Sequence, residues 1–394
     1  MKRFICSLCI FLSASTLTFA KSKKAKEFHD ISSEELVLKM ETGWNLGNTL
    51  DANASTDLSS ETSWGQPQTT KEMIDGIAAA GFKTIRIPVS WSNHLEAKNR
   101  IIDPKWMKRV KEIVDWAIED GLFVIINIHH DNYSSPSGIS YGDGFYPNMV
   151  CWNESMLFIK SVWSQISKTF NNDYDEHLIF EVMNEPRLRG HAHEWWVSAG
   201  CNDCKYGVQV LNKLNQLAVD TIRSSGGNNE KRFIMIPGIA ASPHSVLDSA
   251  EFKMPDDNLS HGKKQRLILS VHMYTPYSFA MEAPGDLTFE KKHKSEIDGT
   301  FTDLNEKYIQ KGIPVVIGEY GATNKNNLEE RVKWFSYFIS QSRRYGMCSI
   351  LWDNGDANAS TAVSEKFGFY NRTEQKWYFP EILEEIMKCA EITE

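Results

Sequence analysis

Eight short runs of apolar and β-branched residues recur along the chain and alternate with longer segments that have helical periodicity. The short runs cover residues 42–47, 83–88, 122–129, 178–184, 232–237, 267–274, 313–319 and 347–353. Several, such as Val124-Ile125-Ile126, are apolar without alternation, which is typical of parallel strands that are buried on both faces. The short runs therefore predict the strands of a parallel sheet.

The longer segments predict helices between these strands. The clearest of them cover residues 71–80, 104–119, 154–171, 208–224, 295–311, 328–345 and 379–388. Gly81, Gly121, Gly312 and Gly346 each follow a helical segment and precede a strand, where a left-handed C-cap is expected. Eight strand–helix alternations without a Pro- or Ser-rich linker favour a single (β/α)₈ TIM barrel over residues 42–394. A doubly wound sheet is the alternative, but its usual phosphate-binding turns, GxGxxG and GxxxxGK(S/T), do not occur in the sequence.

The first 20 residues have the pattern of a secretory signal peptide. Lys2 and Arg3 precede an apolar stretch over residues 4–17, and small residues up to Ala20 suit a cleavage site. The apolar stretch is shorter than the ~20 residues that span a bilayer, which argues against a membrane anchor. We expect residues 1–20 to be removed and the protein to be secreted, extracellular or periplasmic, without stable membrane association. Residues 21–41 are expected to form a spacer and a short helix over the barrel bottom.

Composition narrows the class of partner. The chain has 41% apolar and 24% charged residues, close to globular averages, so a disordered or coiled-coil protein is not expected. Its 43 basic residues are scattered and outnumbered by 51 acidic ones, which argues against nucleic acid as a partner. Aromatic residues make up 11%, and several stand beside Asn, Asp, His or Glu, a combination that suits sugar rings. We expect a monomer.

Five cysteines follow the predicted signal peptide, so an odd thiol remains if the chain is monomeric. The pair Cys201 and Cys204 forms a CxxC motif, for which a local disulfide is the favoured interpretation in a secreted chain. Zinc or redox use is the alternative. The sequence has no second CxxC, and His191 and His193 are near the motif only in sequence.

Polar residues stand at the ends of six of the predicted strands. They are Arg86, His129, His130, Asn184, Glu185, His272, Tyr274, Glu319 and Trp352. The carboxyl ends of the strands in a (β/α)₈ barrel meet at the active site, so these side chains are expected to face one another. A single Glu at a strand end is usually a solvated loop residue, and a single His or Trp is often a packing residue. The joint pattern is what favours an active site.

Two carboxyl groups across a sugar-sized gap are the minimal apparatus for hydrolysing a glycosidic bond. One carboxylic acid donates a proton to the leaving oxygen, while the other carboxylate attacks C1 or activates water. A carboxylate that attacks must be ionised, and a neighbouring cation or hydrogen-bond donor favours that state. Arg86 is the only arginine at these strand ends, and Tyr274 carries a hydroxyl donor, so we expect both beside the nucleophile.

The motifs around these residues resemble those of a known family. They are Gly43-Trp44-Asn45-Leu46-Gly47-Asn48-Thr49-Leu50-Asp51, Ser63-Trp64-Gly65-Gln66-Pro67, Arg86-Ile87-Pro88, Asn184-Glu185-Pro186, His272-Met273-Tyr274, Gly318-Glu319-Tyr320-Gly321 and Trp352-Asp353-Asn354. In this order they are similar to glycoside hydrolase family 5, and within it to the endoglucanases and xyloglucanases of subfamily 4. The resemblance extends from about residue 42 to about residue 387.

The resemblance implies a retaining endo-β-1,4-glucanase that acts on cellulose-type or related β-glucans without a cofactor. It makes Glu185 the acid/base, Glu319 the nucleophile and Arg86 the partner of Glu319. It also makes Asn184 a contact to the sugar 2-hydroxyl in the −1 subsite. A β-mannanase or xylanase of the same family is the alternative.

The family pattern assigns the remaining rim residues to sugar binding. By resemblance, His129 and His272 support the −1 subsite, Tyr274 donates a hydrogen bond near Glu319, and Trp352 forms the platform under the −1 sugar. Asn45, Trp64 and His130 are expected in more distant minus subsites. Loop aromatics are expected either to line plus subsites or to form loop hydrophobic clusters; they are Tyr133, Tyr141, Phe145, Tyr146, Trp152, Trp195 and Trp196.

Two further function classes remain as remote alternatives. A metal-dependent barrel hydrolase would use His129, His130 and His272, but the first strand lacks the His-x-His that such barrels commonly offer, and HExxH is absent from the sequence. A sugar-binding protein without catalysis would have lost one carboxylate, whereas Glu185 and Glu319 are both present. No metal ligands are therefore expected at the rim.

Overall fold

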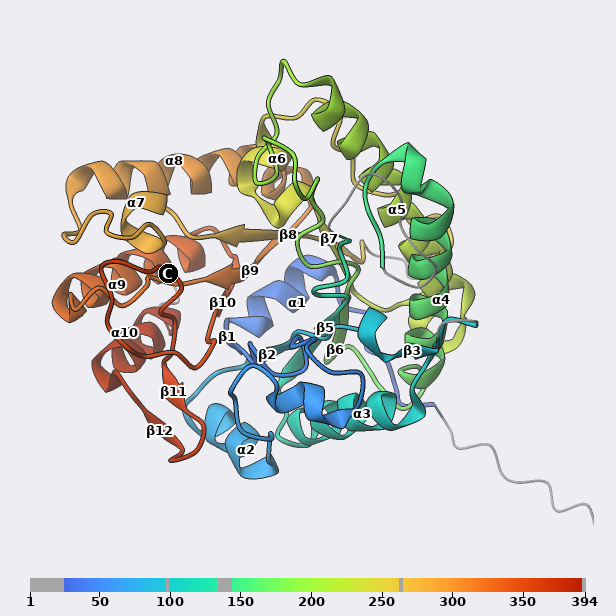
Figure 1. Ribbon diagram of the computed structural model, residues 1–394, viewed down its shortest axis with the longest axis horizontal. Helices are drawn as coiled ribbons and strands as arrows, with labels where there is room; N and C mark the ends of the chain where they lie inside the picture. The colour runs from blue at the N-terminus through green and yellow to red at the C-terminus, as the bar shows by residue number, and fades with distance from the viewer. Residues whose placement is uncertain (1–24, 97–98, 134–143, 262–264, 392–394) are drawn as a thin grey trace, which may run out of the picture.

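Eight parallel strands close into a barrel that is surrounded by helices (Figure 1). The structure is a computed structural model that describes residues 25–96, 99–133, 144–261 and 265–391. The barrel strands are β1 (Thr42–Asn45), β2 (Thr84–Ile87), β5 (Phe123–Asn127), β6 (Leu178–Glu181), β7 (Ile234–Pro237), β8 (Leu267–Met273), β9 (Val315–Tyr320) and β10 (Cys348–Leu351). β1 pairs with both β2 and β10, which closes the sheet. The predicted single (β/α)₈ barrel is confirmed.

Helices follow the strands as the sequence predicts. They are α2 (Lys71–Ala79), α3 (Pro104–Glu119), α4 (Trp152–Thr169), α5 (Asn202–Ser224), α6 (Pro243–Leu247), α7 (Tyr277–Ala280), α8 (Lys291–Lys307), α9 (Leu328–Arg344) and α10 (Pro380–Ala390). Gly81, Gly121, Gly312 and Gly346 have φ values between 69° and 106°, so the expected left-handed conformation is present after each helix. α5 begins at Asn202 rather than at residue 208, because Cys201 acts as its N-cap.

Two short hairpins lie outside the barrel and were not predicted. One pairs β3 (Leu95–Glu96) with β4 (Ile101–Ile102), and the other pairs β11 (Tyr370–Asn371) with β12 (Lys376–Trp377). Strands of two residues are too short to leave a periodic pattern in the sequence.

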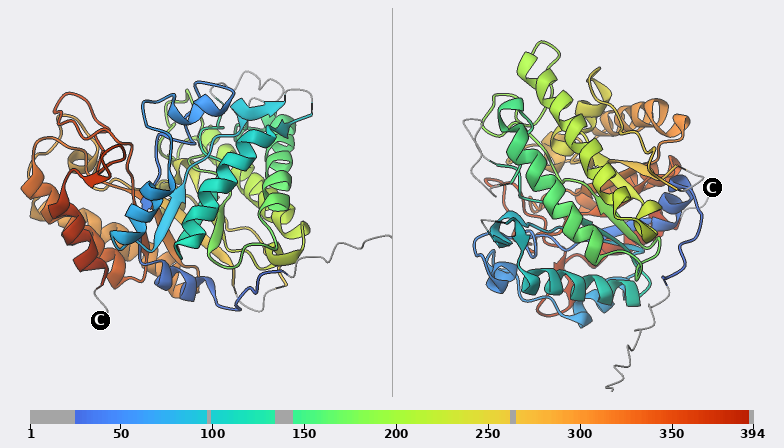
Figure 2. Two further views of the ribbon diagram at one scale, coloured as in Figure 1. Left: turned by 90° about the horizontal axis from the view of Figure 1, so that it is seen from below. Right: turned by 90° about the vertical axis from the view of Figure 1, so that its right-hand side faces the viewer.

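The helix α1 (Ser33–Met40) closes one end of the barrel (Figure 2). Ser32 begins the helix with a capping box, in which its hydroxyl accepts the Glu35 N–H and the Glu35 carboxylate accepts the Ser32 N–H. Leu36, Val37 and Met40 are fully buried against apolar strand residues inside the barrel. These residues form the barrel floor; the strand residues are Ile125, Ile179, Met235, Ile268, Val316 and Ile350.

A layer of buried polar side chains lies above the floor. It is formed by Asn45, Arg86, Asn127, Glu181 and Ser270, none of which has exposed surface. Three of them follow a floor residue by two positions on the same strand, and side chains two apart on a strand share a face. This polar layer supports the rim residues described below.

The predicted signal peptide, residues 1–20, lies outside the described residues. Among the helices that the structure describes, none is long and apolar enough to cross a membrane.

Candidate active site

Glu319 lies near the end of β9 and is held by two donors. Arg86 Nη1 donates to Glu319 Oε1 over 2.9 Å, and the Tyr274 hydroxyl donates to Oε2 over 2.9 Å. The residue is 5% exposed, so both hydrogen bonds are shielded from water. The structure thus brings Arg86 and Tyr274 to the same carboxyl group, as the sequence predicted for the nucleophile.

Glu185 lies in the loop after β6 and faces Glu319 across His272. The Nδ1 atom of His272 is 2.8 Å from Glu185 Oε1 and 3.5 Å from Glu319 Oε2. Arg187 Nη1 donates to Glu185 Oε2 over 3.2 Å. One carboxylate oxygen of each glutamate and a ring nitrogen of His272 all lie within 4.8 Å of one another. Two carboxyl groups and one imidazole therefore share a small space at the rim.

The two carboxyl groups have pKa values that move in opposite directions. Burial raises the pKa of Glu319, and the neighbouring Glu185 charge adds to this rise, so that the total exceeds the lowering by His272 and Arg86. Burial also raises the pKa of Glu185, but the hydrogen bond and charge of His272 and the charge of Arg187 lower it below its ordinary value. Burial lowers the pKa of His272, yet the charges of Glu319 and Glu185 bring it above the ordinary value. A protonated His272 between the carboxyl groups is therefore favoured.

Arg86 is the centre of the polar layer. Its Nε and Nη2 atoms lie 2.9 Å and 2.7 Å from Glu181 Oε2, and its Nη2 also donates to Asn184 Oδ1 over 2.6 Å. Both Arg86 and Glu181 are fully buried, and the carboxylates of Glu181 and Glu319 raise the pKa of the guanidinium. The buried guanidinium is thereby held by hydrogen bonds from one edge to Glu181 and from another edge to Glu319.

Glu181 is a functional neighbour that the strand-end motifs did not single out. It accepts hydrogen bonds from Asn127 Nδ2 over 2.8 Å and from the Ser270 hydroxyl over 2.6 Å, in addition to those from Arg86. Its position two residues after Ile179, on the face that points into the barrel, is the sequence signal that identifies it.

The predicted sugar contact of Asn45 is wrong. The side chain is fully buried, and its Nδ2 donates to the carbonyls of Gly318, Ile350 and Leu351 over 3.0–3.2 Å. Its Oδ1 accepts a hydrogen bond from Arg86 Nη1 over 2.9 Å. All of its polar groups are occupied inside the barrel, so Asn45 positions Arg86 instead of facing a distant minus subsite.

Asn184 and His129 are buried at the rim, and each has one side-chain polar atom already engaged in a hydrogen bond. Asn184 Oδ1 accepts from Arg86, which leaves its Nδ2 amide as the donor for another group. His129 Nδ1 lies 3.1 Å from the Nδ2 amide of Asn127, so Nδ1 is the acceptor and the ring proton is on Nε2. Burial lowers the pKa of His129 well below its ordinary value, so the ring is neutral.

Four rings follow one another along the rim and form an aromatic row. The ring of Trp352 lies parallel to that of His129 at 5.9 Å, His129 contacts His130 at 4.4 Å, and His130 contacts Trp64 at 5.3 Å. Trp64 is 37% exposed and Trp352 is half-buried. Burial lowers the pKa of His130 to about 4, so this ring is also neutral. The row offers flat, uncharged faces beside the two carboxyl groups.

Gly47 allows the Trp352 ring to reach its position. A Cβ atom at Gly47 would lie 2.9 Å from Cη2 of Trp352 and 2.7 Å from the Asp353 carbonyl oxygen. The glycine in the Asn-Leu-Gly-Asn motif after β1 is therefore required by this close approach.

The loop aromatics divide into two groups. Phe145 is 1% exposed and belongs to the main apolar core, whereas Tyr146 is 2% exposed and packs in a smaller cluster with Cys151 and Leu188, so both agree with the expectation of hydrophobic clusters. Trp195 and Trp196 are about half exposed, and the Trp195 ring lies 4.0 Å from the guanidinium of Arg187. Tyr141 lies outside the described residues.

Two rim clusters in the described part of the chain have the composition of metal ligands. They are Glu185 with His272 and Glu319, and Asp51 with His129 and His130. In the first, Arg86, Tyr274 and Arg187 already occupy carboxylate oxygens. In the second, Asp51 accepts the N–H groups of Asn48 and Thr49, and burial raises its pKa to about 6. These internal hydrogen bonds favour acid–base chemistry over metal binding at the rim.

Comparison with known proteins agrees with this geometry. The family model described as cellulase, glycosyl hydrolase family 5, matches residues 50–358. The chain is 42% identical over 363 residues to Endoglucanase B from Ruminococcus albus, covering 91% of this chain and 81% of that protein.

Solved structures show the same similarity. One is a glycoside hydrolase family 5 lichenase from Caldicellulosiruptor sp. F32 in complex with cellotetraose, with a TM-score of 0.84, 42% identity and coverage of 94% of this chain and 98% of that one. Another is a subfamily 4 broad specificity endoglucanase from Ruminococcus champanellensis with bound cellotriose, with a TM-score of 0.82, 38% identity and coverage of 92% and 100%. With two neighbouring carboxyl groups at the rim of a (β/α)₈ barrel, and with this match in sequence and structure, the chain belongs to glycosyl hydrolase family 5, the cellulase family.

Proposed function

We propose that this protein is a retaining endo-β-1,4-glucanase in which Glu319 is the nucleophile and Glu185 is the acid/base. The observation that carries the proposal is the pair of carboxyl groups whose oxygens lie within 4.8 Å, one held by Arg86 and Tyr274 and the other by His272. An oxygen of one carboxyl group within 4.8 Å of an oxygen of the other supports the short separation of retaining enzymes, about 5–5.5 Å, over the ~6.5–9.5 Å of inverting ones.

The reaction proceeds in two displacements. In the first, a Glu319 oxygen forms a bond to the anomeric carbon of the −1 sugar while the bond to the glycosidic oxygen breaks, and Glu185 gives that oxygen its proton. In the second, Glu185 takes a proton from water, whose oxygen replaces Glu319 on the anomeric carbon. Arg86 and Tyr274 stabilise the carboxylate of Glu319 both before the attack and as it leaves.

His272 supplies the proton that the acid needs. Its Nδ1 is 2.8 Å from Glu185 Oε1, and its pKa is raised by the two carboxylates. A sugar that enters between the carboxyl groups excludes water, and this raises the cost of holding two neighbouring carboxylates ionised. Transfer of the Nδ1 proton to Glu185 leaves a neutral acid, an ionised Glu319 and a neutral imidazole. Without substrate the raised pKa belongs to Glu319, but His272 Nδ1 is nearer to Glu185 Oε1, at 2.8 Å, than to Glu319 Oε2, at 3.5 Å, so we assign the transferred proton to Glu185.

The surrounding residues suit a chain of glucose units. The Nδ2 amide of Asn184, oriented by Arg86, is placed to donate to the sugar 2-hydroxyl in the −1 subsite, and His129 Nε2 adds a second donor. The aromatic row of Trp352, His129, His130 and Trp64 offers flat faces for sugar rings toward the minus side. Relatives named as endoglucanases and a lichenase support β-glucans as the substrate class.

We also propose that the protein is secreted after removal of residues 1–20 and acts as a monomer. The first part rests on the signal-peptide pattern of the sequence. Mass spectrometry of the exported protein and sedimentation analysis check the two statements.

The proposal is tested by assaying hydrolysis of soluble polysaccharides by the wild type and Glu319→Gln. Carboxymethyl cellulose, barley β-glucan, xyloglucan, xylan and glucomannan are each incubated with both proteins, and reducing ends and product sizes are followed. We expect the wild type to release oligosaccharides from one or more β-glucans and the variant to lose activity by several orders of magnitude while still binding.

Two results would contradict the proposal. If xylan or glucomannan were hydrolysed and the β-glucans were not, the enzyme would be a xylanase or mannanase. If newly formed sugar ends had the inverted α configuration by nuclear magnetic resonance at early times, the retaining mechanism would be wrong. Glu290→Gln, at an exposed carboxylate that precedes α8, is the matched control and is expected to behave as wild type.

A further inference from the structure

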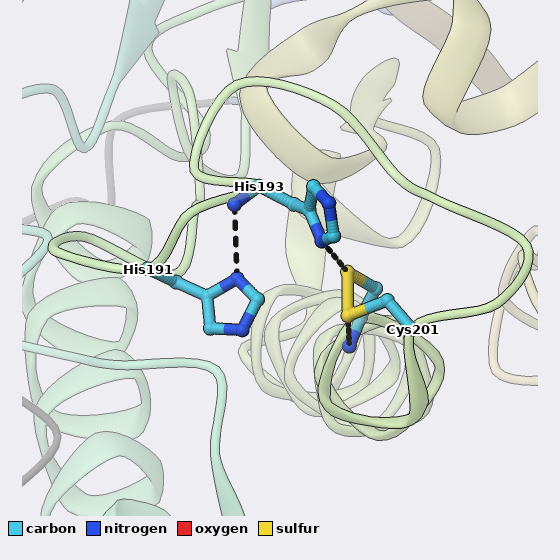
Figure 3. Close-up of side chains that lie close together, drawn as sticks. His191, His193 and Cys201 are labelled. Carbon is cyan, nitrogen blue, oxygen red and sulfur yellow. Dashed lines mark hydrogen bonds between the residues drawn. A yellow bond between two sulfur atoms is a disulfide. The ribbon is translucent and has the colours of Figure 1, made fainter.

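Four side chains of the types that bind metals lie close together where the loop after β6 meets the start of α5 (Figure 3). They are His191, His193, Cys201 and Cys204, and one ligand atom of each lies within 4.8 Å of the others. Cys201 and Cys204 are joined by a disulfide, which confirms the favoured interpretation of the CxxC motif. The two histidines were expected to be near the motif only in sequence, but the structure folds both rings onto the sulfur atoms.

One imidazole of this cluster contacts a sulfur directly, and the other contacts the backbone of the first. His193 Nδ1 lies 3.5 Å from Cys204 Sγ, and His191 Nδ1 accepts the His193 N–H over 3.0 Å. His191 Nε2 lies 3.6 Å from the carboxylate of Asp203, so both ring nitrogens of His191 have a polar neighbour, and binding of a cation by His191 displaces one of these two contacts. Three of the four cluster residues are partly exposed, so an ion from solvent can reach them.

We propose that, once the disulfide is reduced, these four residues bind a zinc ion or a similar soft divalent cation. Two thiolates and two imidazoles are a common ligand set of tetrahedral zinc. Cys201 is the N-cap of the 23-residue helix α5, and its sulfur already accepts the Cys204 N–H over 3.0 Å. Thiolates are stabilised at such a helix end, so the motif is suited to ionised sulfur.

The two states of the cluster exclude each other. A dithiol reductant breaks the Cys201–Cys204 bond, is itself oxidised to a disulfide, and leaves two protein thiols; the cation then replaces the two thiol protons. Zinc–sulfur bonds of about 2.3 Å in a tetrahedral arrangement place the two sulfurs ~3.8 Å apart, so the S–S bond must be broken first. The two sulfurs then move apart, whereas any other pair of ligand atoms that lies at the present upper limit of 4.8 Å needs to approach by about 1 Å.

Both the disulfide and the proposed metal ion would connect the end of the loop after β6 to α5. The proposed acid/base Glu185 lies in this loop, and Arg187 of the same loop donates hydrogen bonds to both Glu185 and Glu194. In a reducing medium, where the disulfide opens, the metal would replace the lost covalent link. The inference stands independently of the glucanase activity, because it concerns ligand atoms that do not contact the rim carboxylates in the structure.

The test uses the whole protein reduced with dithiothreitol and freed of it by anaerobic gel filtration. Cobalt(II) is added first, because tetrahedral Co²⁺ with thiolate ligands has visible and charge-transfer absorption, and Zn²⁺ is then used to displace it. We expect one equivalent of either metal to bind, and X-ray absorption of the zinc form to show sulfur and nitrogen ligands. The oxidised protein is expected to bind neither.

Variants separate the metal site from a disulfide alone. The double variant His191→Ala/His193→Ala is expected to form the disulfide normally by thiol titration but to bind the metal at least 10-fold more weakly. The double variant His244→Ala/His261→Ala, at two exposed histidines elsewhere, is the control and is expected to bind like wild type. Hydrolysis of carboxymethyl cellulose confirms that each variant is folded.

Three results would overturn the proposal. They are a reduced wild type that retains no metal above the level of Cys201→Ser/Cys204→Ser, equal metal affinity in His191→Ala/His193→Ala, and a zinc coordination sphere without sulfur. The last measurement is made on the wild type, so it decides the question even if a variant does not fold.

Discussion

At the scale of single residues, the state of Glu319 is set by two hydrogen-bond donors. The Tyr274 hydroxyl lowers the pKa of this carboxyl group, whereas burial and Glu185 raise it. In Tyr274→Phe that lowering is lost, so the pKa of Glu319 rises. Because the nucleophile must be ionised, we expect the acidic limb of the kcat/KM profile to move to higher pH. A hydrogen bond to a charged group contributes about 1.5–3 kcal/mol, so kcat is expected to fall roughly 10- to 100-fold.

Tyr277→Phe is the matched control for this change. Tyr277 is 61% exposed at the start of α7, three residues from Tyr274. We expect its pH profile to coincide with that of wild type. An unchanged acidic limb in Tyr274→Phe would mean that the tyrosine does not act through the ionisation of Glu319.

Glu185 is distinguished from Glu319 by its dependence on the leaving group. As the proposed acid, it matters most when the departing oxygen needs a proton. In Glu185→Ala we therefore expect a loss of about 10²–10⁴-fold on β-glucan but a much smaller loss of the first step on an aryl cellobioside with an acidic phenol. A burst of released phenol, followed in a stopped-flow spectrophotometer, measures that step.

Glu194→Gln serves as the control because Glu194 contacts the same arginine, Arg187, as Glu185 does. It is expected to show no dependence on the leaving group. Equal losses on both substrates in Glu185→Ala would assign the acid/base role to another residue.

At the scale of the strands, the polar layer connects β2, β5, β6 and β8 through Glu181. This carboxylate is fully buried and binds Arg86, Asn127 and Ser270. Removal of one partner from a buried ion pair typically costs about 3–5 kcal/mol, and in Glu181→Gln the buried guanidinium of Arg86 keeps only one carboxylate partner, Glu319. We expect Glu181→Gln to lower the free energy of unfolding by about this amount in urea denaturation.

Glu319→Gln is the informative comparison, since Glu319 also binds Arg86. Folding raises the pKa of Glu319, so at pH values above the ordinary pKa the ionised carboxylate lowers the stability of the folded state. Replacement of this carboxylate by an amide removes the charge and its repulsion with Glu185. We expect Glu319→Gln to be as stable as wild type although it is inactive. If it lost as much stability as Glu181→Gln, the two carboxylates would have the same structural role.

The sequence pattern predicted the eight strands, the barrel and the rim residues, but it did not predict the polar layer. Strong apolar runs and strand-end motifs marked Glu185, Glu319 and Arg86. Glu181 is a single polar residue within a strand buried on both faces, and its meaning depends on which side points into the barrel. Asn45 was assigned to a distant minus subsite from the family pattern, which does not show how the side chain is buried. Only the closed sheet shows that its amide is used by Arg86 and backbone carbonyls.

The contacts of the histidine rings also required the fold. His191 and His193 lie 10 and 8 residues before Cys201, and their distance to the sulfurs depends on the path of an irregular loop. Loop paths follow from side-chain packing and have no periodic pattern in the sequence. The disulfide was predictable because the CxxC spacing is local.

At the scale of the whole molecule, the apolar residues that stabilise the barrel and the carboxyl groups proposed for catalysis lie at opposite ends of the barrel. The apolar floor and α1 close one end, the polar layer lies in the middle, and the carboxyl groups face the other end. A change at the floor is therefore expected to alter the free energy of unfolding without altering the geometry of Glu185 and Glu319. The separation is a general property of this architecture, in which residues at the carboxyl ends of the strands carry the chemistry.

Leu36→Ala tests this separation. Leu36 is fully buried between α1 and the barrel floor, and truncation of such a leucine costs about 2–5 kcal/mol because transfer energy is lost and a cavity remains. Leu38→Ala on the same helix is the control, since Leu38 is 46% exposed and its truncation is expected to cost less than about 0.5 kcal/mol. We expect the urea midpoint to fall in the first variant only, while kcat per folded molecule on β-glucan stays at the wild-type value in both. A fall in kcat of folded Leu36→Ala would show that the floor is coupled to the rim. The polar layer connects the floor to Glu319 through Arg86. The same measurement of kcat in Ser270→Ala would then test whether the coupling passes through that layer.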